Sequence, residues 1–109
     1  MAGTGLAWAL LVAAGLLEVG FTTFLRLSDG FRNLLPTLGF LATAAGSFSL
    51  LALAQRTLPL GIAYAVWVGI GAAGTLIVGR LFFAEALSPA QLLLVLLLVA
   101  SIVGLRLLS

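Results

Sequence analysis

Four long apolar stretches take up almost all of this 109-residue chain, and they constrain its fold more than any other feature. They run over about residues 5–25, 34–54, 58–83 and 89–107, and each supplies the roughly 20 apolar residues that a helix needs to cross a bilayer. None of them alternates polar and apolar residues as the strands of a membrane barrel do. We therefore predict an all-α integral membrane protein with four transmembrane helices in a single domain, residues 1–109.

The short connections between the stretches leave no room for a soluble domain. The first stretch lacks a basic segment before it and is too long for the apolar part of a signal peptide, so we expect it to be a retained span. Prolines near the start of a helix cost least, because the missing backbone donor has no partner there. Three prolines fall near the starts of predicted spans: Pro36, Pro59 and Pro89.

Composition argues against several classes of function. Hydrophobic residues make up 63% of the chain and charged residues 7%, which is typical of a membrane protein. With no cysteine and no histidine, we expect neither a disulfide nor a metal site, and no cofactor. The five basic residues are scattered arginines without an aromatic platform, so we do not expect nucleic-acid binding. The sequence offers no nucleophile paired with a base, so we do not expect an enzyme.

The arginines are distributed almost evenly between the two sides of the membrane. Four spans place Arg56 and Arg106 on the side of the termini, and Arg26, Arg32 and Arg80 on the other side. Such a small difference barely biases orientation under the positive-inside rule, so insertion in both orientations is compatible with the sequence. The alternative, in which one arginine or the insertion machinery fixes a single orientation, stays open. In either case we expect a multi-pass protein of a bacterial-type inner membrane.

Glu18 is the only acidic residue inside any of the apolar stretches. An ionised carboxylate is costly at membrane depth, so it must protonate, pair with a cation or face water. No arginine is expected at the same depth, since Arg26 lies two turns further along the first span. The natural partners are therefore a proton and a cationic ligand, which exclude one another. The alternative is a protonated Glu18 that donates one structural hydrogen bond between helices.

Residues one turn from Glu18 are expected to share its helical face. Gly15 precedes it and leaves room, whereas Phe21 and Thr22 follow it and supply an aromatic ring and a hydroxyl. We predict that these residues surround a bound cation.

A second group of candidates lies in the third span. Tyr64 and Trp67 are one turn apart, so two aromatic faces can wall a cation site, with the tyrosine hydroxyl bonding the carboxylate. Anchoring at the membrane interface is the rival explanation for such aromatics. Gly69 and Gly71 then weaken the helix in mid-span, which suggests either a bend or close packing of helices.

With these residues in hand, the chain resembles the small multidrug resistance transporters over essentially its full length. The resemblance implies an antiparallel dimer of dual-topology subunits that exchanges protons for cations. The partner is then a second copy of this chain or a homologous, oppositely oriented subunit. The motifs that carry the resemblance are Leu17-Glu18-Val19, Arg26, Asp29-Gly30-Phe31, Gly46-Ser47-Phe48 and the decapeptide from Leu58 to Trp67.

The same resemblance implies roles for individual residues. It implies that Glu18 of both subunits binds the proton or the substrate, and that Tyr64 and Trp67 line the pocket. It also implies that Ser47 supports the carboxylate. Finally, it implies that the segment from Gly69 to Gly71 is a hinge used in alternating access.

The branch of the family is mixed. Gly15 and Ala84-Glu85 are similar to the guanidinium-exporter branch, whereas Thr22-Thr23 is similar to the branch that exports quaternary ammonium and polyaromatic cations. Phe21 matches neither branch. We expect a proton-coupled antiporter, driven by the proton gradient, that exports small guanidinium-type or alkyl-ammonium cations. The alternatives are a broad multidrug exporter of quaternary ammonium and aromatic cations, and a proton-carrying structural proteolipid.

Overall fold

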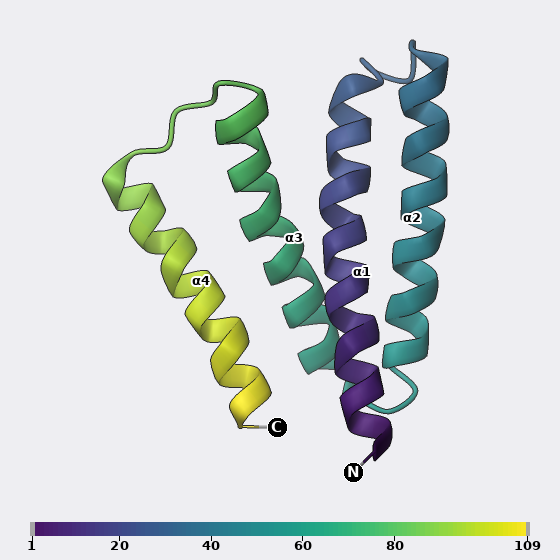
Figure 1. The fold of residues 1–109 in the computed structure, drawn as a ribbon, viewed down its shortest axis with the longest axis vertical. Coiled ribbons are helices and arrows are strands. Elements are labelled where there is room, and N and C mark those ends of the chain that lie inside the picture. The colour runs from purple at the N-terminus through teal and green to yellow at the C-terminus, as the bar shows by residue number, and fades with distance from the viewer. Residues whose placement is uncertain (1, 109) are drawn as a thin grey trace.

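The computed structural model describes residues 2–108, with side chains from residue 4, and consists of four helices joined by short loops (Figure 1). Each helix is long and apolar enough to cross a membrane, so the predicted all-helical membrane architecture is confirmed. The second and fourth helices have the expected bounds, and the other two differ by a few residues. The bounds are α1 Ala2–Leu27, α2 Leu34–Ala54, α3 Leu60–Phe82 and α4 Pro89–Leu107.

Proline chemistry sets where the last two helices begin. Pro59 is the N-cap of α3, so this helix starts two residues later than the apolar stretch did. Pro89 is the first residue of α4, where its missing N–H has no helical partner to lose. Ser88 and Gln91 cap the same helix, since the Ser88 hydroxyl accepts from the Gln91 N–H at 3.1 Å and the Gln91 Oε1 accepts from the Ser88 N–H at 2.9 Å.

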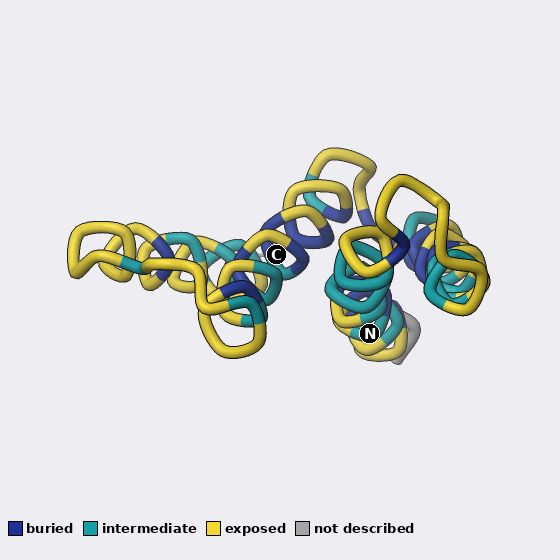
Figure 2. Tube along the Cα trace, turned by 90° about the horizontal axis from the view of Figure 1, so that it is seen from above, coloured by how far each residue is buried: buried dark blue, intermediate teal, exposed yellow. Residues whose placement is uncertain are grey.

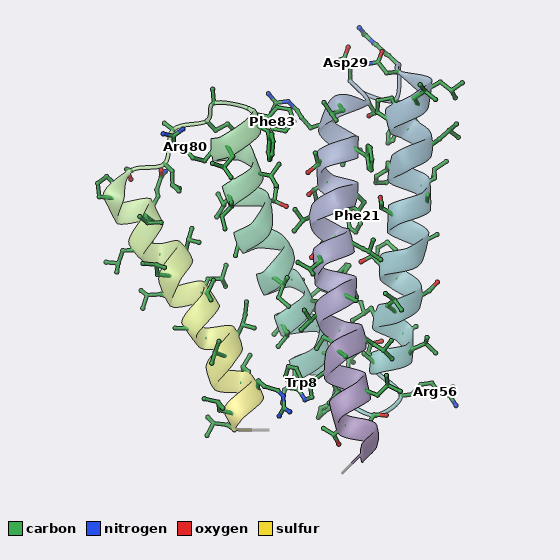
Figure 3. The ribbon with its side chains drawn as sticks, viewed as in Figure 1. Trp8, Phe21, Asp29, Arg56, Arg80 and Phe83 are labelled. Carbon is green, nitrogen blue, oxygen red and sulfur yellow. The ribbon has the colours of Figure 1, made fainter. Side chains whose placement is uncertain are left out.

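The helices stand in a single row, in the order α4, α3, α1, α2 (Figure 1). Within the described chain, α1 packs against both α2 and α3, whereas α4 packs mainly on α3. The Arg106 guanidinium of α4 also lies over the Trp8 ring of α1, 5.1 Å from its centre. The Cα positions extend over 44 × 34 × 17 Å, so the row is a flat layer about half as thick as it is wide. Both termini and the Arg56 loop lie at one end, and Asp29, Arg80 and Phe83 lie at the other (Figure 3).

Burial is confined to the surfaces where helices meet. Figure 2 shows buried residues on the facing sides of α1, α2 and α3, whereas the outer helix of the row, α4, is mostly exposed. Val95 is the one buried residue among those described in α4. Large apolar side chains such as Leu35 and Phe82 cover the outside, at 80% and 76% exposure. Such a surface suits lipid or another protein chain rather than water.

The loop between α1 and α2 is a tight reversal held by one buried hydroxyl. Three successive residues, Asp29, Gly30 and Phe31, have φ values of 49°, 67° and 67°, in the left-handed region. Ser28, which is fully buried, donates its hydroxyl to the Leu25 carbonyl at 2.7 Å and accepts from the Phe31 N–H at 3.2 Å. These two hydrogen bonds stabilise left-handed φ values, which are sterically unfavourable for residues with a Cβ such as Asp29 and Phe31.

Candidate functional site

The Glu18 carboxylate lies between α1 and α3, against the backbone of Gly71. A Cβ atom at Gly71 would overlap the carboxylate, so the absence of a side chain there makes room for it. Glu18 is half-buried, and its Oε1 atom is buried without a hydrogen-bond partner in the described chain. Arg26, the nearest arginine in the sequence, is paired with Glu85 instead. A polar atom left unpaired inside a membrane span is expensive, which favours a functional role over a structural one.

The glycines predicted to shape the site lie at helix contacts. Gly15 faces Ile70, whose Cβ would be 2.7 Å from a Cβ on Gly15, so an α3 side chain fills the space that we expected to be open. Gly69 faces Ile102 of α4, where the corresponding distance to Cδ1 is 2.9 Å. Together with Gly71, these residues let α3 approach its neighbours closely. Because α3 is a continuous helix, a bend at Gly69 and Gly71 stays a prediction.

Ser47 joins three helices at the depth of the carboxylate. Its hydroxyl donates to the Ala14 carbonyl of α1 at 2.6 Å and accepts from the Trp67 indole N–H of α3 at 3.0 Å. All three residues are buried, and Ala14 lies one turn before Glu18. The described hydrogen bonds of Ser47 thus hold Trp67 and α1 rather than the carboxylate, and its expected support of Glu18 stays a prediction.

Aromatic rings from three helices gather beside this bridge. The Phe21 ring stacks on Phe48 with centroids 5.9 Å apart and lies 6.4 Å from the Trp67 ring. Trp67 in turn contacts Phe48 at 5.4 Å and Tyr64 at 5.7 Å. Phe40 packs edge-on against Phe21 at 6.0 Å. Phe21, in the middle of its span in Figure 3, thus packs with rings of α2 and α3, and its expected place beside a cation bound to Glu18 stays a prediction.

The structure differs from the prediction for the Tyr64 hydroxyl. Among the described residues no hydrogen bond joins Tyr64 to Glu18, and Tyr64 is 55% exposed. The physical reason is the shape of the row, since a single copy covers the α3 face that carries Tyr64 on one side only. The Tyr64 ring nevertheless reaches Trp67, with centroids 5.7 Å apart.

Two threonine hydroxyls extend the polar character of the α1–α3 contact. Thr22, one turn after Glu18, donates to the Val19 carbonyl at 3.0 Å and pairs with the Thr75 hydroxyl at 2.8 Å. The sequence pattern singled out Thr22 but not Thr75. The spacing of four between Gly71 and Thr75 is the signal that would have found it, because it continues the face of α3 that meets Glu18.

This arrangement provides the groups that a membrane-embedded cation site needs. A carboxylate supplies negative charge, and the rings of Phe21 and Trp67 supply faces that attract cations. Within residues 2–108, no three side chains of the types that bind metals lie close enough to hold an ion. The fold and the site together therefore define a four-helix membrane protein with a carboxylate inside its spans.

Comparison with known proteins agrees with this class. Residues 6–98 match the family described as Small Multidrug Resistance protein. The chain is 47% identical over 102 residues to a protein named guanidinium exporter from Citrobacter freundii, covering 94% of this chain and 97% of that one. It is 48% identical over 104 residues to the guanidinium exporter of Yersinia pestis, covering 95% and 100%. It is 45% identical over 102 residues to that of Salmonella typhimurium, covering 94% and 97%.

The chain therefore belongs to the small multidrug resistance family of membrane transporters. It is a multi-pass transporter and not an enzyme, and members of its family work as small dimers.

The contact between Glu18 and Gly71 yields a first prediction. In Gly71→Ala the new methyl group pushes the carboxylate out of the α1–α3 contact, and overpacking of this kind costs about 1–3 kcal/mol. Thermal unfolding in detergent should show this loss, and a membrane-soluble carbodiimide should label Glu18 faster. The matched control is Gly61→Ala in the same helix, where no atom lies within 4 Å of the added Cβ. Identical behaviour of the two variants would contradict the assigned contact.

Proposed function

We propose that this chain exports small guanidinium-type cations in exchange for protons. The observation that carries the proposal is the half-buried Glu18 carboxylate inside a membrane span, with one oxygen unpaired. Phe21, one turn after Glu18, and Trp67, one turn before its contact Gly71, add aromatic rings to the same two helices. The names of the relatives, guanidinium exporters at 45–48% identity, support this choice of substrate. The proton gradient supplies the driving force, and no cofactor takes part.

Exchange follows from competition for one carboxylate. The ionised Glu18 binds a cation through its charge, with the rings of Phe21, Trp67 and Tyr64 against the face of the cation. Protonation removes the charge, so the cation leaves on the side where protons are plentiful. The neutral carboxyl then gives up its proton on the other side and binds the next cation. Inside the membrane the carboxylate is stable only when it carries a proton or pairs with a cation.

A second subunit is needed to complete the site. The row of helices extends only 17 Å in its thinnest direction and leaves Tyr64 exposed, so one copy cannot enclose a cation. Two copies in opposite orientations would bring together two Glu18 side chains and give two access states related by symmetry. The nearly even division of arginines supports such dual insertion in a bacterial-type inner membrane. The partner is a second copy of this chain or a homologous chain of opposite orientation.

The packing of the Phe21 ring favours compact substrates. Phe21 stacks on Phe48 and lies beside Trp67, so its ring fills space that a large substituent on the cation would need. A guanidinium ion or a short alkyl-ammonium ion has no such substituent. The alternative substrate class is that of bulky quaternary ammonium and aromatic cations, as handled by a broad multidrug exporter.

A second prediction tests the mechanism. Glu18→Gln should fold and dimerise, but it should neither release protons when guanidinium is added in detergent nor accumulate guanidinium in proteoliposomes against a pH gradient. The matched control is Asp29→Asn, which neutralises an exposed carboxylate in the first loop and should retain both activities. Coupled transport by Glu18→Gln would refute the mechanism. Absence of cation-induced proton release from the wild type would favour a proton-carrying proteolipid.

A third prediction concerns substrate size. Phe21→Trp should narrow the pocket and favour guanidinium, whereas Phe21→Gly should open it and admit tetraphenyl-type cations. Changes in such a pocket are worth about 10- to 200-fold in relative transport efficiency. The measurement is the ratio of guanidinium to tetraphenylphosphonium transport, with thermal unfolding to show that each variant folds. An unchanged ratio in both variants would place the Phe21 ring outside the pocket.

A fourth prediction concerns orientation. Two extra arginines beside Arg56 should force one orientation and abolish transport, because no oppositely oriented partner forms. A variant with two extra arginines beside Arg32 should be equally inactive alone. Co-expression of the two should restore transport. Full activity of either variant by itself would show that subunits of one orientation suffice.

A further inference from the structure

The guanidinium group of Arg26 is itself held in a site made of a carboxylate and an aromatic ring. Its Nη1 atom lies 3.4 Å from the Glu85 Oε2 atom, and its Cζ atom lies 5.1 Å from the centre of the Phe83 ring. Arg26 lies in the last turn of α1, whereas Phe83 and Glu85 follow α3, so the contact bridges two separate helices. An anion that pairs with the charge and a ring that covers the flat face are what a free guanidinium ion requires.

The backbone after α3 is shaped to present these two side chains. Ala84 has a φ of 54°, in the left-handed region, and reverses the chain. The N–H groups of Phe83 and Glu85 then both donate to the Gly79 carbonyl at 3.1 Å. The Glu85 carboxylate folds back over Gly79, where a Cβ atom would overlap it. The hydrogen-bonded turn therefore determines where the Glu85 carboxylate lies.

A small cavity adjoins the Arg26 contact, and we call it the polar cavity after the charged and threonine side chains in its lining. It has a volume of about 70 Å³, and its lining includes Arg26, Glu85, Thr22 and Thr75. That volume and those polar side chains suit one or two water molecules. Thr22 lies one turn from Glu18 on α1, so this lining shares a helical face with the carboxylate.

We propose that Glu85 and Phe83 form a second, peripheral guanidinium site, which Arg26 of the same chain occupies until a substrate ion displaces it. Displacement opens the polar cavity toward Glu18. The inference rests on the proposed function, because it assigns the same class of cation to a second place in the chain.

The exposure of the contact makes such displacement feasible. The Arg26 and Glu85 side chains are 62% and 53% exposed, and an exposed ion pair shifts an equilibrium by about fivefold or less. A buried pair would close the cavity permanently. An exposed pair closes it weakly, so free guanidinium in large excess competes for the same carboxylate and ring.

The absence of native cysteine gives a direct test. In a Glu18→Gln background, which removes the central site, Thr75→Cys places one thiol in the polar cavity. A small neutral thiol reagent should label it up to about two- to fivefold faster when guanidinium chloride, titrated to large excess, displaces Arg26. Potassium chloride at the same ionic strength should have a much smaller effect. Leu76→Cys, the adjacent residue outside the cavity, should show no guanidinium dependence.

Removing the carboxylate should remove the response. With Glu85→Gln added, labelling of the cavity thiol should be fast from the start and indifferent to guanidinium. Val78→Cys lines the same cavity and replaces Thr75→Cys if that variant does not fold. An unchanged labelling rate, an equal effect of potassium chloride, or a full response in Glu85→Gln overturns the second site. Because labelling needs no transport, these results are distinct from failure of Glu18→Gln to abolish exchange, which overturns the proposed function alone.

Discussion

The hydroxyl of Ser47 is the contact on which the arrangement of the other helices depends. It donates to the Ala14 carbonyl and accepts from the Trp67 indole, so a single buried group links α2, α1 and α3. Apolar packing has little orienting power inside a lipid environment, where the surroundings are as apolar as the side chains. A directional link at this depth fixes the rotation of α1 and α3, and with it the placement of Glu18 against Gly71 and of Phe21 against Trp67.

Most of the fold follows from the requirements of the bilayer. Backbone groups must be satisfied within each span, so four apolar stretches of sufficient length can form only helices. Pro59 and Pro89 then mark where two of these helices begin. The depth of Glu18 follows in the same way, since it is the only acid within the stretches. These features depend on length and composition, which the sequence states directly.

The details of the site depend on what periodicity leaves open. A helical face can be read from spacing, but not the neighbour that it meets, which is why Gly15 proved to lie under Ile70. The partners of Ser47 and the pairing of Thr22 with Thr75 depend on the rotation of three helices about their axes. The contact of Arg26 with Glu85 depends on one left-handed residue, Ala84. Nothing in the apolar pattern specifies that turn.

The position of α4 separates its outer surface from the surroundings of Glu18. This helix packs mainly on α3 and meets α1 where the Arg106 guanidinium lies over the Trp8 ring, at 5.1 Å from its centre, and most of its surface is exposed. The Glu18 carboxylate lies instead between α1 and α3, against Gly71. The exposed face of α4 can therefore change in sequence without altering the contact that holds the carboxylate.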